Sequence, residues 1–405
     1  MTPEFKGFML LASAKMIFVF TVINIGVMMI IWQERRQSAF AQDRLGPNRV
    51  GPFGLLQSVA DGLKNFMKEE TFPAQADKLL FVLAPLLSFI PALLSFAVIP
   101  FAAPLPLSFD FSLPIVGRFV YAGDLPMVIA NLPIGFLFIL AITSLGVYGI
   151  VLAGWASNSK YAFLGGMRAS AQMVSYEIAM GMSLIVIMIV VGNVTLGEVV
   201  TQQQRSTWFI LPLLVGFAIF LVSALAETNR LPFDLPEAES ELITGYHTEY
   251  SSMKFSMFFI AEYSNMITAA ALLATFFLGG WDIPFTVWDD GNPTVLKTLA
   301  TMLAFAFKTW LFLALYIQIR WTLPRFRFDQ LMQLGWKFMI PATLGYIVLI
   351  ATAVWVLESQ GVAFGPTYSF ILFGINLVVG YFLFWVLDRG RVVRGATHSR
   401  QGQAG

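Results

Sequence analysis

Residues 227–251 read ETNRLPFDLPEAESELITGYHTEYS and separate two long apolar runs, 207–227 and 252–278. This connection holds six of the 24 acidic residues of the chain, namely Glu227, Asp234, Glu237, Glu239, Glu241 and Glu249. Carboxylates beside apolar segments are costly to desolvate, and neighbouring carboxylates couple their titrations. The stretch therefore predicts a membrane fold with a site of proton exchange at one surface.

The composition of the whole chain agrees with a membrane protein. Of 405 residues, 57% are hydrophobic and 12% are charged, which is about half the charged fraction of a soluble domain. The net charge of +1 gives no basic field for nucleic acid. Cysteine is absent and the two histidines, His247 and His398, lie outside the apolar runs. The sequence thus argues against an iron–sulfur cluster or a buried haem in this chain.

Nine apolar runs reach the roughly 20 residues that a helix needs to cross a bilayer. They are 8–32, 79–103, 127–154, 170–192, 207–227, 252–278, 298–320, 337–357 and 366–387. The first run lacks the pattern of a removable signal, so we expect a permanent helix. The predicted fold class is all-α, a polytopic transmembrane bundle of about nine spans forming one integral-membrane domain over residues 1–387.

The distribution of lysine and arginine predicts the orientation. Nineteen of the 25 basic residues fall in alternate connections and in the basic stretch 388–405, which we expect to be disordered. Because basic residues favour the cytoplasmic side, the N-terminus should lie outside and the C-terminus inside.

The first inside connection contains a predicted helix of its own at 53–70, FGLLQSVADGLKNFMKEE. Leu56, Val59 and Leu63 recur at helical spacing, while Asp61 and Lys64 fall elsewhere on the wheel. Such a pattern predicts an amphipathic helix lying at the membrane interface.

Charged residues within or at the end of the apolar runs are the first candidates for chemistry, because each costs about 2.5–3.5 kcal/mol at a helix centre. They are Glu177, Glu227, Glu262 and Lys308. Ion pairs that tie helices together would explain any one of them. For three carboxylates and a lysine in one bundle, a proton or ion pathway is the better interpretation.

The acidic connection has a structural explanation as well. Asp234 and Glu237 resemble a helix N-cap residue followed three positions later by an acidic residue. Acidic residues are favoured in the first turn of a helix. This accounts for neither Glu241 nor Glu249. The sequence contains no glycine-rich phosphate loop, nucleophile triad or metal-ligand motif, so covalent catalysis is not expected.

Six segments occur in a characteristic order. They are ERR at 34–36, RLGPNRVGPFGLLQSVADGLK at 44–64, AGWASNSKYAFLGGMRASAQMVSYE at 153–177, AETNRLPFDLPEAESELITGYHTEYSSMKF at 226–255, IAEYSNM at 260–266 and LPRFRFDQLM at 323–332. On these segments, over about three quarters of the chain, the sequence resembles the quinone-site membrane subunit of respiratory complex I. This family comprises the H subunit of the bacterial NADH-quinone oxidoreductase and its mitochondrial counterpart, NADH dehydrogenase subunit 1.

The resemblance implies a proton-translocating NADH:quinone oxidoreductase in a bacterial cytoplasmic membrane. This chain would form the quinone chamber and bind no cofactor itself. Quinone would be the substrate, while NADH, FMN and the iron–sulfur clusters would belong to partner subunits. The implied partners are peripheral-arm subunits, including the one with the terminal cluster, together with small membrane subunits and antiporter-like subunits.

The resemblance also assigns residues. The quinone chamber and its entrance would include Arg35, Arg36, Asp61, Lys64 and Arg230. An acidic funnel would include Glu237, Glu239, Glu241 and Glu249. A membrane proton path would include Glu177, Glu227 and Glu262 with Arg168 and Lys308. Three departures from the family pattern stand out: Ser58 replaces a usual proline, Ser252 replaces a common glycine, and many members lack the ninth run.

Other functions remain open at this level. A stand-alone proton-coupled transporter could use Glu177, Glu262 and Lys308. The chain could also be the membrane anchor of a related membrane-bound hydrogenase, or a purely structural anchor that docks a soluble oxidoreductase.

Overall fold

The computed structural model describes residues 2–113, 117–234, 245–284, 286, 288, 291–362 and 364–388. Its helices are α1 (Pro3–Ala41), η1 (Pro52–Gly54), α2 (Gln57–Met67), α3 (Lys78–Leu94), η2 (Ser95–Val98), α4 (Gly135–Ala156), α5 (Lys160–Val191), α6 (Leu196–Arg205), α7 (Leu214–Glu227), α8 (Ser252–Phe277), α9 (Val295–Thr322), α10 (Phe328–Gln333), η3 (Leu334–Met339), α11 (Ile340–Ser359) and α12 (Pro366–Asp388). Two strands, β1 (Leu105–Leu113) and β2 (Gly117–Leu125), complete the fold. The basic stretch 389–405 lies outside the described residues.

The predicted polytopic helical bundle is confirmed. Within the described residues, eight helical segments are long and apolar enough to cross a membrane: α1, α3 with η2, α4, α5, α8, α9, α10 to α11, and α12. The ninth predicted run contains α12, and the fifth contains α7, which is only 14 residues long. Each of the nine predicted runs therefore contains a helix.

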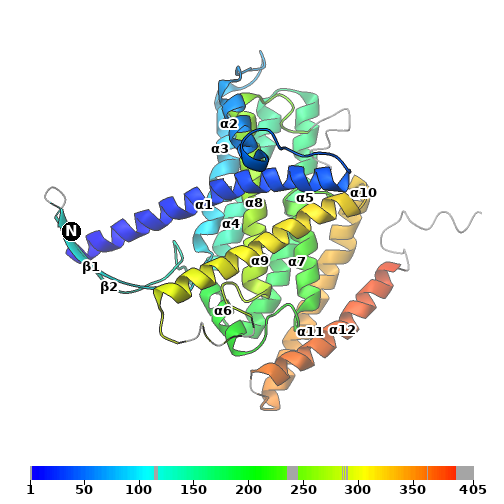
Figure 1. Ribbon diagram of the computed structural model, residues 1–405. Helices are drawn as coiled ribbons and strands as arrows, with labels where there is room; N and C mark the ends of the chain where they lie inside the picture. The colour runs from blue at the N-terminus through cyan, green and yellow to red at the C-terminus, as the bar shows by residue number, and fades with distance from the viewer. Residues whose placement is uncertain are drawn as a thin grey trace, which may run out of the picture.

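α8 lies at the centre of the bundle and packs against α1, α2, α3, α6, α7 and α9. Its second half is rich in small buried residues, among them Ala270, Ala271 and Ala274, none of which is exposed. Small side chains let helix backbones approach closely inside a membrane, where lipid gives no hydrophobic drive for association. α1 and α9 cross the front of the bundle obliquely (Figure 1). A cavity is lined by residues of α1, α8 and α9.

A two-stranded hairpin interrupts the helical plan. β1 and β2 pair antiparallel, with Leu105 opposite Leu125. The hairpin runs beside the N-terminal part of α1, away from the bundle (Figure 1), where a Cβ at Gly7 would meet the Val120 carbonyl oxygen at 2.2 Å. Lys15 Nζ anchors the following chain by donating to the carbonyls of Pro126 (3.1 Å) and Val128 (2.7 Å). No element was expected from the sequence between the second and third apolar runs.

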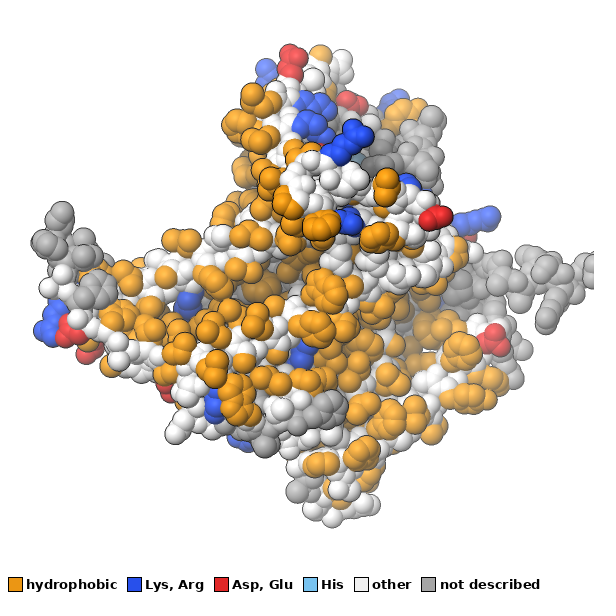
Figure 2. Space-filling view, viewed as in Figure 1, with side chains coloured by type: hydrophobic (Ala, Val, Ile, Leu, Met, Phe, Trp, Pro, Cys, Tyr) orange, Lys and Arg blue, Asp and Glu red, His pale blue; other side chains and the backbone are white. Residues whose placement is uncertain are grey.

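The surface agrees with a protein immersed in lipid. Apolar side chains cover most of the face in Figure 2, and basic side chains gather at the end that carries α2. On α2 the apolar side chains of Leu63, Phe66 and Met67 are exposed. This is the arrangement expected of a helix at the interface, because its apolar side would face lipid.

Candidate functional site

Hydrogen bonds hold α2 to its neighbours at both ends. Near its start, the Ser58 hydroxyl donates to the Met28 carbonyl of α1 at 2.8 Å. At its end, the Ser252 hydroxyl, at the beginning of α8, lies 2.9 Å from the carbonyls of both Asn65 and Lys68. Ser252 adopts φ 59°, a region that favours glycine. Both serines that depart from the family pattern therefore hold α2 against its neighbours.

An opening lies between α1, α2 and α8, with a volume of about 660 Å³; we call it the mouth cavity. Its inner wall is apolar and includes Val27, Ile31 and Phe259. Its rim is charged: Arg35 pairs with Asp61, and Lys64 Nζ lies 3.7 Å from an Asp61 carboxylate oxygen. All three rim residues line the cavity, so the structure brings Arg35, Asp61 and Lys64 together.

Arg36 points elsewhere. Its Nη1 donates to the Phe53 carbonyl at 3.1 Å, and its guanidinium lies over the rings of Trp32, Phe40 and Phe53. It is not among the residues that line the mouth cavity. The structure thus separates Arg36 from the rest of the predicted entrance.

A second cavity of about 380 Å³ surrounds Arg230 and is polar; we call it the Arg230 chamber. Arg230 Nη1 lies 3.1 Å from a Glu34 oxygen, and Arg230 Nε lies 2.9 Å from a Glu262 oxygen. Arg320 also pairs with Glu34, whose other oxygen accepts a hydrogen bond from the Tyr263 hydroxyl at 2.7 Å. The Arg230 guanidinium lies over the Tyr263 ring, 4.3 Å from its centre.

Four separate segments bring this cluster together. α1 supplies Glu34, α8 supplies Glu262 and α9 supplies Arg320. The turn after α7 supplies Arg230, whose backbone N–H donates to the Leu225 carbonyl at 3.2 Å. The side chains of Glu34, Arg230 and Glu262 are only 8%, 11% and 12% exposed. Two buried carboxylates balance two arginines, so removing one partner would leave an uncompensated charge, which costs about 3–5 kcal/mol.

Glu34 and Arg320 were not among the residues assigned to the site from the sequence. Glu34 did carry a signal, because it continues the buried face of α1 formed by Ile23, Val27 and Ile30. A carboxylate on a buried helical face needs a charged partner. The partner itself, Arg320 at the end of α9, could not be identified without the fold.

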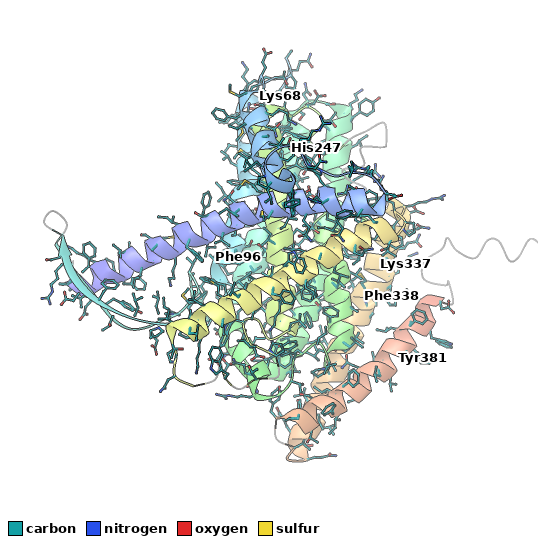
Figure 3. The ribbon with its side chains drawn as sticks, viewed as in Figure 1. Lys68, Phe96, His247, Lys337, Phe338 and Tyr381 are labelled. Carbon is teal, nitrogen blue, oxygen red and sulfur yellow. The ribbon has the colours of Figure 1, made fainter. Side chains whose placement is uncertain are left out.

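His247 and Asp234 complete the Arg230 chamber. His247 is buried among the aromatic rings of Tyr246 and Phe255, and this burial lowers the pKa of His247 to about 4. The imidazole is therefore neutral near pH 7. Asp234 Oδ2 lies 3.3 Å from Arg325 Nη2, so this carboxylate pairs with a cation. The helix that Asp234 was predicted to cap would lie outside the described residues. Figure 3 shows His247 near Lys68, at the same end of the molecule as α2.

A third, smaller cavity continues from the Arg230 chamber. It has a volume of about 30 Å³ and is lined in part by Glu227, Asn229 and Glu262, and a polar space of this size has room for a water molecule. Glu227 interacts electrostatically with Glu177, and Glu177 accepts a hydrogen bond from the Ser144 hydroxyl. The structure thus brings all three predicted membrane carboxylates into one series.

The three cavities share lining residues. Phe259 and Tyr263 line both the mouth cavity and the Arg230 chamber. Asn229 and Glu262 line both the Arg230 chamber and the third cavity. The three cavities are therefore neighbours: the mouth cavity has a charged rim and apolar walls, the Arg230 chamber is charged, and the third cavity is lined by the carboxylates Glu262 and Glu227.

Two residues of the predicted proton path lie away from this series. Lys308 Nζ donates to the carbonyls of Leu278 (2.5 Å), Gly280 (3.1 Å) and Asp282 (2.6 Å), just beyond the end of α8. Arg168 lies over the Phe328 ring at 5.5 Å. Neither residue lines any of the three cavities. Lys308 instead binds carbonyls of the C-cap residue and of the turn that follows α8, and a cation is favourable at this end of a helix.

Of the residues predicted to form the acidic funnel, only Glu249 lies within the described part of the chain. Glu237, Glu239 and Glu241 lie outside the described residues, and Glu249 is half-buried in the turn that leads into α8. Within the described part of the chain, no group of three or more histidine, aspartate or glutamate side chains is arranged to hold a metal ion.

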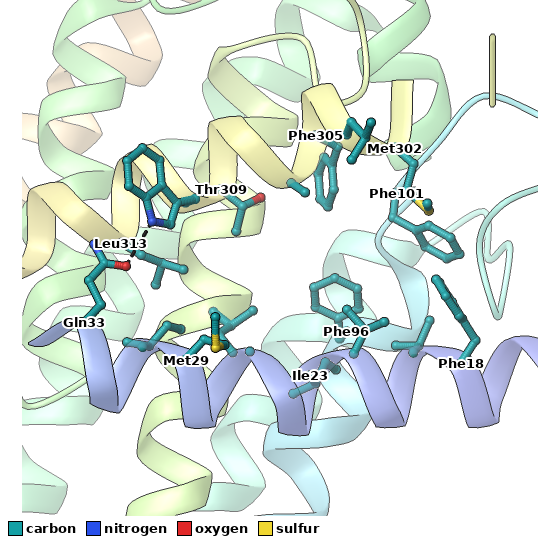
Figure 4. A pocket seen from close by; sticks show the side chains of 18 of the residues that line it. Phe18, Ile23, Met29, Gln33, Phe96, Phe101, Met302, Phe305, Thr309 and Leu313 are labelled. Atoms are coloured by element: carbon teal, nitrogen blue, oxygen red, sulfur yellow. Dashed lines mark hydrogen bonds between the residues drawn. The ribbon is translucent and has the colours of Figure 1, made fainter. Parts of the chain in front are cut away.

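A separate apolar groove lies between α1 and α9, with a volume of about 440 Å³ (Figure 4). Phe18, Phe96 and Phe305 are among its lining residues, and none of the described residues that line it is charged. At one end Trp310 Nε1 donates to Gln33 Oε1 at 2.9 Å, closing the groove with a neutral hydrogen bond.

The family model described as NADH dehydrogenase matches residues 14–351. This chain belongs to the NADH dehydrogenase family. It is 47% identical over 351 residues to the NADH-quinone oxidoreductase H subunit 2 of Koribacter versatilis, covering 86% of this chain and 98% of that protein. It is 46% identical over 339 residues to the NADH-quinone oxidoreductase H subunit 1 of Cytophaga hutchinsonii, covering 83% of this chain and 94% of that protein.

A third relative is the NADH-quinone oxidoreductase H subunit of Rickettsia peacockii. The identity is 46% over 348 residues, covering 85% of this chain and 94% of that protein. The family resemblance inferred from the sequence motifs is thus confirmed. The match to the family ends at residue 351, so α12 lies wholly beyond it.

Proposed function

We propose that this chain is the membrane subunit of a proton-translocating NADH:quinone oxidoreductase, in which it forms the quinone-binding chamber. The observation that carries the proposal is the series of three linked cavities. An isoprenoid tail requires apolar walls, which the mouth cavity supplies at Val27, Ile31 and Phe259. A polar headgroup requires hydrogen-bonding and charged groups, which the Arg230 chamber supplies.

The same geometry supports a coupling of quinone reduction to proton movement. Reduction of a quinone to a quinol adds two electrons and two protons. A unit charge several ångströms away in a low-dielectric site changes the energy of a carboxylate by a few kcal/mol. Glu262 faces both the Arg230 chamber and the third cavity, so a charge near Arg230 would be felt first by Glu262 and then by Glu227 and Glu177.

The electron carriers would belong to partner subunits. The chain contains no cysteine, so it offers no thiolate for an iron–sulfur cluster. We place the peripheral-arm subunit with the terminal cluster at the α2 end, and small membrane and antiporter-like subunits beside the bundle. The distribution of basic residues supports an N-terminus outside and a cytoplasmic C-terminus. The bacterial relatives support a location in a bacterial cytoplasmic membrane.

A steric plug of the mouth cavity tests the proposal. Gly62 lines this cavity, and a Cβ at Gly62 would meet no atom within 4 Å, so Gly62→Trp should fold while it narrows the opening. Complexes purified in mild detergent through a C-terminal tag should contain iron–sulfur and antiporter-like partners. In these complexes we expect Gly62→Trp to reduce NADH:quinone turnover at least fivefold and to raise the KM for quinone.

The matched control is Met67→Trp, which adds the same ring on α2 at a side chain that is exposed and lines none of the three cavities. It should retain normal turnover. Equal activities of the two variants would contradict quinone entry at this mouth, and purification of the chain without any partner would contradict the proposed complex.

A further inference from the structure

α7 is a broken membrane helix. Its 14 residues cover about 21 Å, less than the roughly 30 Å of a bilayer core. The preceding residues 210–213 form turns, so the helix begins inside the bundle at Leu214. The first N–H groups of a helix have no partner within the helix, and unsatisfied backbone groups are costly where water is absent. Another part of the chain must therefore satisfy them.

Asn376 of α12 supplies the partner of one of these groups, the Val215 N–H. Its Oδ1 accepts from the Val215 backbone N–H at 3.2 Å, and its Nδ2 donates to the Pro212 carbonyl at 2.6 Å. The same Oδ1 accepts from the Tyr346 hydroxyl of α11 at 2.7 Å. Asn376 is completely buried. One amide thus joins the start of α7 to both α11 and α12, as a helix cap supplied by another helix.

The packing around Asn376 is close. Ser369, Leu372 and Asn376 form the buried face of α12 at helical spacing. Gly380 continues this face, and a Cβ there would contact Val215 Cγ2 at 3.6 Å. The opposite face of α12, which includes Val378 and Tyr381, is exposed, and Figure 3 shows Tyr381 at the outer edge of the molecule. The residues of this face that meet the start of α7 are thus one polar residue, Asn376, and one small residue, Gly380.

The other end of α7 enters the candidate site. Glu227 is its last residue, and Arg230 follows within one turn. From Val215 to Glu227 the helix rises by about 18 Å. Because a continuous helix moves as a rigid rod over this length, its axial position at Val215 also sets the position of Glu227.

We propose that α12 is a brace for the broken helix α7, and that Asn376 is a positioning residue for Glu227 and Arg230. α12 lies beyond the part of the chain that matches the family, so this brace is an addition to the shared fold. The inference rests on the proposed function, because it assigns Asn376 an effect on the turnover of the assembled complex.

Asn376→Leu tests the proposal in the complete complex, because leucine keeps a similar volume but makes no hydrogen bond. The amount of assembled complex is measured first, and kcat and KM for quinone are then measured per assembled complex. We expect kcat to fall threefold to tenfold while KM stays within twofold of normal, since the mouth cavity is untouched. Tyr346→Phe removes the hydrogen bond to Asn376 Oδ1 and the bond that the Tyr346 hydroxyl accepts from the Gly216 backbone, and should lower kcat by twofold to threefold.

The matched control is Leu377→Ala, the next residue on α12, whose side chain is about half exposed; it should leave kcat unchanged. Normal kcat in assembled Asn376→Leu would overturn the proposal. So would failed assembly of Asn376→Leu together with normal kcat in Tyr346→Phe, which would leave Asn376 a purely structural role. Failure of the proposed function is distinguishable, because the unaltered complex would then not reduce quinone.

Discussion

The Arg230 chamber and the groove between α1 and α9 both have residues of α8 and α9 in their walls, and their volumes are similar at about 380 and 440 Å³. Their linings differ completely. The chamber brings charged residues from several segments together, among them Arg230, Glu262 and Arg320. The groove is lined by apolar side chains, with Gln33 and Thr309 as polar exceptions among its described residues.

This difference in lining distinguishes a candidate functional site from an apolar cavity that needs no function to explain it. Lipid chains can fill an apolar cavity that faces the membrane, so such a cavity requires no polar or charged residues. Charged residues are costly to bury inside a membrane, so a cavity lined by them indicates a function. For a membrane protein, the polarity of a cavity therefore indicates chemistry better than its size does.

The largest effect should follow from removing the central cation of the chamber. Arg230→Met leaves Glu262 without its ion pair and Glu34 with one arginine instead of two. We expect a loss of at least tenfold in NADH:quinone turnover per assembled complex, measured in membranes. Arg118→Met, which removes an exposed arginine paired with Asp110 in the hairpin, should retain normal turnover. Equal turnover of Arg230→Met and Arg118→Met would contradict a functional role for the Arg230 chamber.

A smaller effect should appear in the pH dependence of the stability of the complex, through His247 in the wall of the Arg230 chamber. Because burial lowers the pKa of His247 from 6.5 to about 4, the unfolded chain binds more protons than the folded chain between these pH values. Stability should therefore fall as the pH drops below about 6.5, by up to about 3 kcal/mol at pH 4. His247→Gln should make thermal inactivation of the purified complex less steeply dependent on pH between 7.5 and 5. An unchanged pH dependence would contradict a buried neutral imidazole.

The smallest effect is expected in the groove. Ala306 lines the groove between α1 and α9, so Ala306→Phe would fill part of this space without touching the three linked cavities. We expect turnover and KM for quinone to stay within twofold of normal. A rise in KM as large as that of Gly62→Trp would show that quinone uses the groove as well.

Sequence patterns predicted much of this architecture because they depend on local properties. Each of the nine apolar runs contains a helix, and α2 (Gln57–Met67) falls within the amphipathic stretch 53–70. The mouth residues Arg35, Asp61 and Lys64 lie together as the family motifs imply. These features follow from hydropathy, helical periodicity or the order of motifs, all of which can be recognised without the fold.

Contacts between distant segments could not be predicted in this way. The partners of Lys308 are backbone carbonyls at 278–282, which no side-chain pattern reveals. Asn376 appears in the sequence as one polar residue in an apolar run, and its partners lie more than 150 residues away at Pro212 and Val215. The hairpin did leave a signal, since Phe109 and Phe111 alternate with polar residues, as is typical of a strand.

The most direct test of the account is to map the binding site of a photoreactive quinone in the intact complex. After illumination and digestion, the labelled peptides are identified by mass spectrometry. We predict labels on α1 within residues 24–35, on α2 and on α8 within residues 255–263, all suppressed by excess quinone and by Gly62→Trp. Labels concentrated on residues 302–313 of α9, and unaffected by Gly62→Trp, would place quinone in the apolar groove and contradict the account.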